Sequence, residues 1–127
     1  MTNLRNQNER VRSERERGWI VYFLYHAQPR ALEIASLRTL LDARNIPLSS
    51  HRLAGQLSYL CELRLVKVEL GRNSVGIDDN QAARALERYA DSDRDGLNEA
   101  MSVRLTTAGI NFQEGVGASL DGISRVE

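Results

Sequence analysis

The chain has 127 residues, of which 42% are hydrophobic, and this is enough for one domain with a single core. No apolar run approaches the roughly 18 to 20 residues of a membrane-spanning helix, and residues 1–17 are polar, so neither a membrane span nor a signal peptide is predicted. The single cysteine, Cys61, can form neither an internal disulfide nor a cysteine-based metal site by itself. We therefore expect a cytoplasmic protein.

Charge is balanced overall but unevenly distributed. The 17 basic residues equal the 17 acidic residues, which argues against strong DNA binding, because phosphate binding needs clustered Lys or Arg. Residues 1–70 carry ten Arg and one Lys against seven acids (plus four), and residues 71–127 carry six Arg against ten acids (minus four). Arginine suits bidentate contacts to phosphate or guanine. A GC-rich genome that favours arginine codons would give the same composition.

Two segments precede the first proline break. Residues 1–17 are almost devoid of apolar side chains, and the spacing of Leu4 and Val11 is too sparse for a coiled coil, so we expect a solvated helical extension or an arm. Residues 18–27, GWIVYFLYHA, are apolar nearly all round and predict a buried helix. His26 at its end has no carboxylate or thiol partner in the pattern, so we expect a cap or surface residue.

The next two segments form a helix-turn-helix pattern. Residues 30–45 show helical spacing of their leucines, and Asn45 can take a left-handed conformation at the helix end, before a turn through Pro47. A second helix over 49–63 can be capped by Ser49 or Ser50. One face carries Leu53, Leu57, Leu60 and Arg64, with Cys61 at its margin, and the opposite face carries His51, Arg52, Gly55, Gln56, Ser58, Tyr59 and Glu62.

The second half of the chain predicts two strands separated by an insertion. Residues 66–70 and 102–106 alternate as strands do, and about thirty residues lie between them, more than a hairpin loop needs. Residues 79–90 predict a helix with Ala82, Ala83, Leu86 and Ala90 on one face. Thr106 or Thr107 should cap a last short helix whose Ile110 packs on the core.

One acidic stretch resembles the start of a calcium-binding loop. Asp91, Asp93, Asp95 and Gly96 match the first positions of an EF-hand, but Ser102 stands where a bidentate glutamate belongs. We therefore expect a solvated turn and no bound metal or other cofactor.

The order helix, helix, turn, helix, strand is typical of a winged helix-turn-helix. The predicted fold is mainly α with a small β-hairpin, and its enlarged wing carries an inserted helix. We expect a polar extension over 1–17, a winged-helix domain over 18–115 with the wing insertion at 71–101, and a flexible tail over 116–127.

The leucines of helix 49–63 and the residues after the second strand also suggest a family. The pattern of Leu57, Leu60, Leu65 and Val66, followed by Leu105, Thr106, Gly109 and Gly115, resembles the small winged-helix proteins of Mu-like bacteriophages and prophages. More distantly it is similar to ArsR- and MarR-type regulators. The match covers residues 18–71 and 102–115. The resemblance implies a location in the bacterial host cytoplasm and a role in transcription regulation.

Two departures from the family pattern bear on function. Arg64 stands where a glycine usually precedes the Leu-Val pair, so the end of the helix must be accommodated differently. An acidic insertion of about thirty residues replaces a short basic hairpin, which weakens the expectation that the wing contacts the minor groove.

The leading functional hypothesis is that helix 49–63 reads double-stranded DNA in the major groove. The residues expected to face DNA are Ser50, His51, Arg52, Gly55, Gln56 and Tyr59, and those expected to contact phosphate are Arg30, Arg38 and Arg44. A homodimer through the wing helix or the N-terminal helix could present two such helices. The alternative is a protein–protein interaction module of phage assembly or DNA packaging, which the neutral charge favours. The sequence contains no nucleophile–base pair, phosphate-binding loop or metal-ligand cluster, so we do not expect an enzyme.

Overall fold

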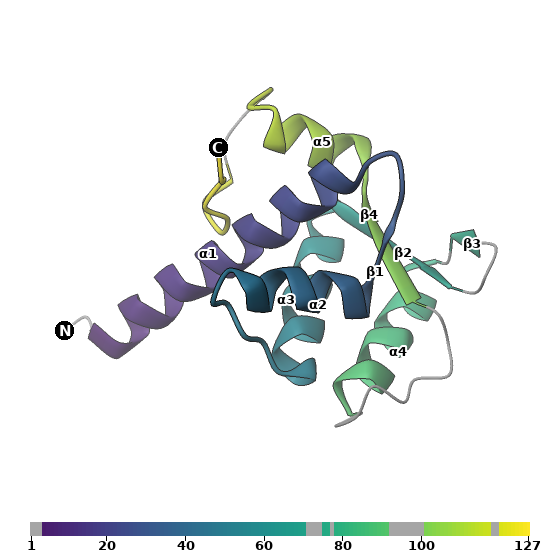
Figure 1. Cartoon of the computed structure of the whole chain (residues 1–127), viewed down its shortest axis with the longest axis horizontal. Coiled ribbons are helices and arrows are strands. Elements are labelled where there is room, and N and C mark those ends of the chain that lie inside the picture. Colours follow the sequence, from purple (N-terminus) through teal and green to yellow (C-terminus); the bar gives the residue numbers. More distant parts are fainter. Residues whose placement is uncertain (1–3, 71–74, 77, 92–100, 118–119) are drawn as a thin grey trace.

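The computed structural model describes residues 4–70, 75–76, 78–91, 101–117 and 120–127, and within these ranges the chain is mainly helical with a small antiparallel sheet (Figure 1). The elements are α1 (Leu4–Ala27), β1 (Leu32–Glu33), α2 (Ile34–Ala43), α3 (Ser50–Glu62), β2 (Val66–Leu70), β3 (Val75–Gly76), α4 (Asp79–Ala90), β4 (Met101–Leu105) and α5 (Thr107–Gln113). The strand order is β1-β4-β2-β3. The EF-hand-like positions 93–96 lie outside the described residues. In the described part of the chain, no helix has the length and apolar character needed to cross a bilayer.

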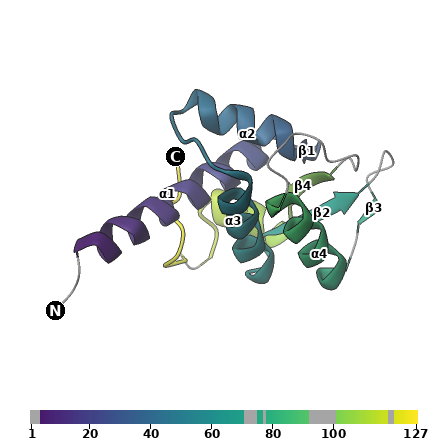
Figure 2. The same cartoon turned by 90° about the horizontal axis from the view of Figure 1, so that it is seen from below.

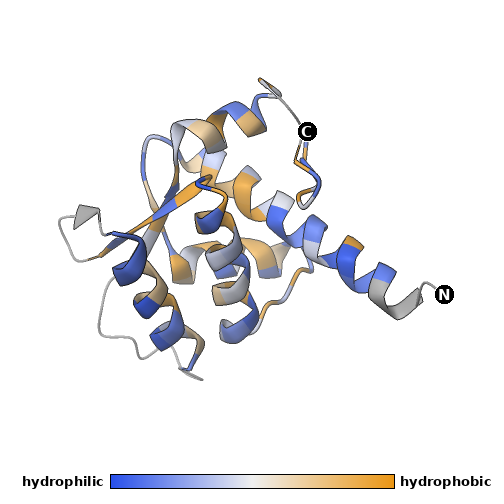
Figure 3. Ribbon diagram, turned by 180° about the vertical axis from the view of Figure 1, so that it is seen from behind, coloured by the Kyte–Doolittle hydropathy of each residue, from blue (hydrophilic) through white to orange (hydrophobic). Residues whose placement is uncertain are grey.

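The polar extension and the buried helix predicted before Pro29 form one helix, α1. Its C-terminal half buries Ile20, Val21 and Leu24 in the core. The residues before Gly18 are mostly hydrophilic, and the N-terminal end of the helix projects beyond the other elements (Figures 1 and 3). The expectation that residues 1–17 form a solvated extension is wrong at Glu16, which is only 2% exposed. Because α1 is one continuous helix, the face that packs on the core through Ile20 and Leu24 also includes Glu16, four residues before Ile20.

The helices predicted over 30–45 and 49–63 correspond to α2 and α3. Helix α2 begins four residues later than predicted, because β1 pairs with β4 through the register Leu32↔Val103. Asn45 has φ 58°, the left-handed conformation expected at this helix end. Ser49 caps α3, with its hydroxyl accepting from the backbone N–H of Arg52 at 3.1 Å. The leucines of α3 are fully buried as predicted, namely Leu53, Leu57 and Leu60.

The two longer strands, β2 and β4, form the centre of the sheet. Strands β2 and β4 pair antiparallel from Val66↔Leu105 to Leu70↔Met101. The placement of Arg64 on the leucine face is wrong, because α3 ends at Glu62 and Arg64 lies beyond it, exposed and with φ 61°. Arginine thus takes the left-handed position that a glycine would occupy at lower cost.

The predicted insertion helix, α4, folds onto α3 (Figure 2). Its capping box is formed by Asp78 and Gln81. The predicted apolar face is partly wrong, because Ala83 is exposed and Ala90 only half-buried. The buried residues are Ala82, Ala85, Leu86 and Tyr89. Since Leu86 is 2% exposed, the apolar face of α4 packs inside the chain and is not available for the homodimer contact considered above.

The last residues of the tail, which was predicted to be flexible over 116–127, contact the rest of the chain. Ile123 is 6% exposed, and the backbone N–H of Ser124 donates to the carbonyl of Glu14 on α1 at 3.0 Å. The side-chain amide of Gln113 donates to the carbonyl of Val126. One apolar side chain and a few hydrogen bonds therefore hold the tail against α1 and α5, although its glycine-rich sequence predicts mobility.

Two glycines inside helices give opposite predictions for substitution by alanine. A Cβ on Gly18 would lie 1.8 Å from the carbonyl oxygen of Ser124, so Gly18→Ala should displace the tail and lose the burial of Ile123, at about 1.5 to 3 kcal/mol. A Cβ on Gly55 would meet no atom within 4 Å, so Gly55→Ala should stabilise the chain by about 0.5 to 1 kcal/mol. Thermal denaturation followed by circular dichroism measures both changes. Equal stability of Gly18→Ala and the parent would show that the tail is not seated on α1.

Candidate functional site

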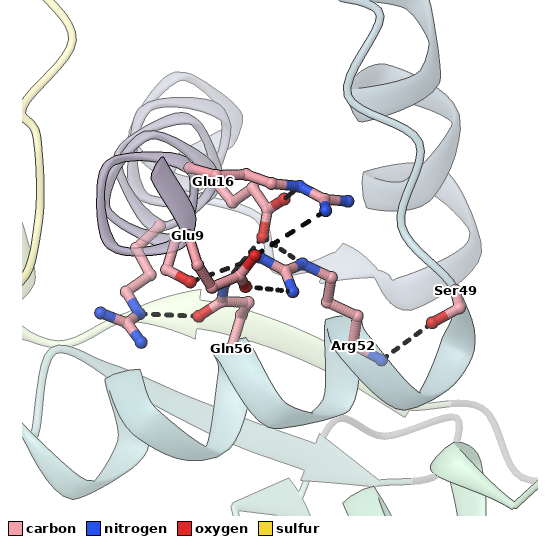
Figure 4. A network of polar contacts seen from close by, with 8 residues as sticks. Glu9, Glu16, Ser49, Arg52 and Gln56 are labelled. Carbon is pink, nitrogen blue, oxygen red and sulfur yellow. Dashed lines mark hydrogen bonds and ion pairs between the residues drawn. The ribbon is translucent and has the colours of Figure 1, made fainter. Parts of the chain in front are cut away.

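The polar face of α3 meets α1 in a cluster of charged and amide side chains, which we call the α1–α3 network (Figure 4). At its centre is Glu16, whose side chain is 3% exposed. One carboxylate oxygen of Glu16 accepts from Arg52 Nε at 2.7 Å and from Gln56 Nε2 at 2.8 Å, and the other accepts from Arg12 Nε at 3.0 Å. The network comprises Glu9, Arg12, Ser13, Glu16, Arg17, Arg52 and Gln56.

Each nitrogen of the Arg52 guanidinium has a partner on α1. Besides the bond from Nε to Glu16, Nη1 lies 2.7 Å from Glu9 Oε1 and Nη2 donates to Ser13 Oγ at 3.3 Å. Partial burial alone would lower the pKa of Arg52, but the hydrogen bonds to Glu16 and Glu9 outweigh it and raise the pKa. The hydrogen bond from Arg52 to Glu9 in turn lowers the pKa of Glu9. Three of the five N–H donors of the Arg52 guanidinium are therefore engaged with α1, which holds the side chain against α1 and away from a base edge.

Gln56 is more deeply buried, with 5% of its surface exposed. Its carbonyl oxygen accepts from Arg17 Nε at 2.7 Å, and its amide nitrogen donates to Glu16. Arg17 also donates to the carbonyl of Gly122 at 3.0 Å, and its guanidinium stacks 3.6 Å from the centre of the Tyr59 ring. This amide therefore joins α3 to α1, and the ring of Tyr59 lies beneath Arg17.

The prediction that Arg52, Gln56 and Tyr59 face outwards is corrected by this arrangement. All three lie on the side of α3 that α1 covers, in the α1–α3 network or directly beneath it. The cause is geometric. The polar N-terminal part of α1 is continuous with its apolar C-terminal part, so the polar side chains of α1 lie against α3. Desolvated polar groups must find partners, and these side chains satisfy one another.

The other residues predicted to contact DNA fall into two groups. His51 and Gly55 are exposed on α3, and Ser50 at its first turn accepts a hydrogen bond from Arg38 Nη1 at 3.1 Å. Two arginines are exposed elsewhere: Arg30 in the loop after α1, and Arg44 at the end of α2, 4.8 Å from the centre of the Trp19 ring. Of the predicted phosphate-contacting arginines, Arg38 is thus the one that hydrogen bonds to the first turn of α3.

A narrow line of residues remains open on α3 between α1 and α4. It consists of His51, Gly55, Ser58 and Glu62, which follow one another at spacings of four, three and four and so share a helix face. We call this line the outward strip. It carries no lysine or arginine, and its last residue is an acid. The helix therefore presents little to a phosphate or a guanine edge.

The residues of α1 that complete the network were not predicted from the sequence; they are Glu9, Arg12, Ser13, Glu16 and Arg17. A signal for Glu16 is present, because it stands four residues before Ile20 and eight before Leu24 and so continues their buried stripe. A carboxylate in phase with a core stripe indicates a buried partner for it. The identity of that partner, 36 residues away in the sequence, has no local signal.

Comparison with known proteins does not supply a family. The chain matches no protein-family model, and neither a curated protein nor a solved structure matches it. In the part of the chain that the structure describes, no group of three or more His, Cys, Asp or Glu side chains could hold a metal ion.

Proposed function

We propose that the chain is a winged-helix interaction module, encoded by a phage or prophage, that binds a protein partner and does not read DNA sequence. The winged-helix assignment is supported by the order α2, turn, α3, β2 and β4, in which the two longer strands pair antiparallel directly behind α3. The long connection that carries α4 corresponds to the enlarged wing.

The observation that carries the proposal is the α1–α3 network. Base reading in the major groove needs long polar side chains with free donors or acceptors. On α3 these side chains are Arg52 and Gln56, and both are bound by α1. Turning them towards DNA would remove two of the three side chains that bond the buried carboxylate of Glu16 and leave it with Arg12 alone, which is unfavourable.

Charge supports the same function. The net charge of the whole chain is zero, and the outward strip of α3 contributes no cation. Affinity for DNA rests chiefly on the neutralisation of phosphates by clustered lysine and arginine. A neutral, mixed surface is instead typical of protein–protein contacts.

A second candidate function, DNA binding through the backbone of α3, is favoured by one observation. The space beside Gly55 is open, and Ser50, His51 and Arg38 lie around the first turn of the same helix. A duplex could approach this end closely, with Arg30 and Arg44 on phosphates. Such binding would follow the shape of DNA and would not use Arg52 or Gln56.

Selection of binders from random duplex DNA distinguishes the two functions. We expect the parent protein to enrich no motif and its residual binding to vanish at moderate salt, because few phosphates are neutralised. Arg44→Ala should then change little. Binding that survives moderate salt, with or without an enriched motif, would overturn the interaction-module proposal, and weakening of all sequences alike by Arg44→Ala would assign that residue to a phosphate.

A further inference from the structure

A groove of about 320 Å³ lies between α3 and α4, two helices that Figure 2 shows side by side. Its apolar part is formed by Cys61, Ala82, Ala83 and Leu86. Charged side chains also line it, namely Glu62, Arg64, Asp79 and Glu87. Ser58 and Glu62 belong to the outward strip as well, so the groove and the strip form one continuous surface.

The charged residues of the groove are unbalanced. Three carboxylates, on Glu62, Asp79 and Glu87, are exposed there against the single guanidinium of Arg64. Among the described residues, no ion pair neutralises any of the three. The groove therefore has a negative potential that repels phosphate and attracts a cation.

The pKa of the Cys61 thiol reflects both the burial and the negative charge of the groove. The pKa of Cys61 is raised to about 11, chiefly by burial and in smaller part by the nearby carboxylates of Asp79 and Glu62. A thiol is hard to ionise where the surroundings are apolar and negatively charged. The same surroundings favour a ligand group that combines an aliphatic stem with a positive charge.

We propose that the groove between α3 and α4 docks a basic segment of a partner protein, which inserts an arginine or lysine side chain. This inference rests on the proposed interaction function and names the chemistry of the partner. The aliphatic stem would pack on Cys61 and Ala83, which line the groove and are less buried than Ala82 and Leu86, and the charged head would reach Glu62 and Glu87. The volume is near the lower end of the range for ligand pockets, about 300 to 1,000 Å³, which suits one long side chain.

The test uses a fluorescent decapeptide of alternating arginine and alanine, with a glutamate–alanine peptide of the same length as the charge control. Fluorescence anisotropy measures binding to the full chain. The groove variant combines Glu62→Gln with Glu87→Gln, and the matched control combines Glu33→Gln with Asp42→Asn, which removes two exposed carboxylates outside the groove. Circular dichroism establishes that each variant is folded.

We expect the parent to bind the arginine peptide and not the glutamate peptide. The groove variant should bind about tenfold more weakly, and the matched control should stay within about twofold of the parent. A third variant, Ala83→Arg, adds a cation beside the groove without removing an acid and should also weaken binding.

Two results would overturn the inference: no binding by the parent, or equal weakening in the groove variant and the matched control. A parallel titration with duplex DNA separates the two proposals. A DNA motif enriched by the parent would refute the interaction function, whereas failure of the peptide alone would refute only the groove.

Discussion

Replacing Leu57 by alanine should lower the free energy of unfolding by about 2 to 5 kcal/mol, the range for a leucine deleted from a packed core. The Leu57 side chain is fully buried in the middle of α3. It belongs to the same core cluster as residues of α1, α2 and the sheet. A typical domain is stable by only about 5 to 15 kcal/mol, so the substitution should remove a large share of the stability and lower the melting temperature by several degrees. Urea denaturation followed by circular dichroism measures the change.

Leu63→Ala provides the matched control, because Leu63 is 38% exposed just beyond the end of the same helix. Its effect should stay within about 0.5 kcal/mol, as for most surface substitutions. A melting temperature of Leu57→Ala within a degree or two of the parent would mean that α3 is rotated about its axis relative to the arrangement described.

Replacing Arg52 by alanine should also destabilise the chain, by about 2 kcal/mol. Removal of one partner from a fully buried ion pair costs about 3 to 5 kcal/mol. The expected loss is smaller because the Arg52 side chain is 26% exposed and because Arg12 still contacts Glu16 after the substitution. The same urea denaturation measures it.

Arg10→Ala is the control for this second prediction. Arg10 pairs with Glu14 on the same helix, and its side chain is 74% exposed, so the loss should be about 0.5 kcal/mol or less. If Arg52→Ala is as stable as the parent, the α1–α3 network does not hold the two helices together. Arg52 would then be free to contact DNA, and α3 could read bases with this side chain.

The sequence by itself determined the elements whose cause is local. The leucine spacing of α3, the Ser49 cap, the left-handed Asn45 and the capping box of α4 were predictable, because each depends on residues within about two helical turns. The mainly helical class with a small antiparallel sheet followed from these elements. The start of α2 was misplaced, because it depends on the pairing of β1 with a strand about seventy residues away.

Only the tertiary structure decided which polar side chains of α3 are free. Periodicity separates an apolar face from a polar face, but it does not say which part of the polar face another helix will cover. Arg52 and Gln56 are covered because α1 stays helical through Glu16 and Glu9, and His51 and Gly55 are not. Ion pairs between residues 36 to 43 positions apart form only when the packing of the apolar residues has already set the helices side by side.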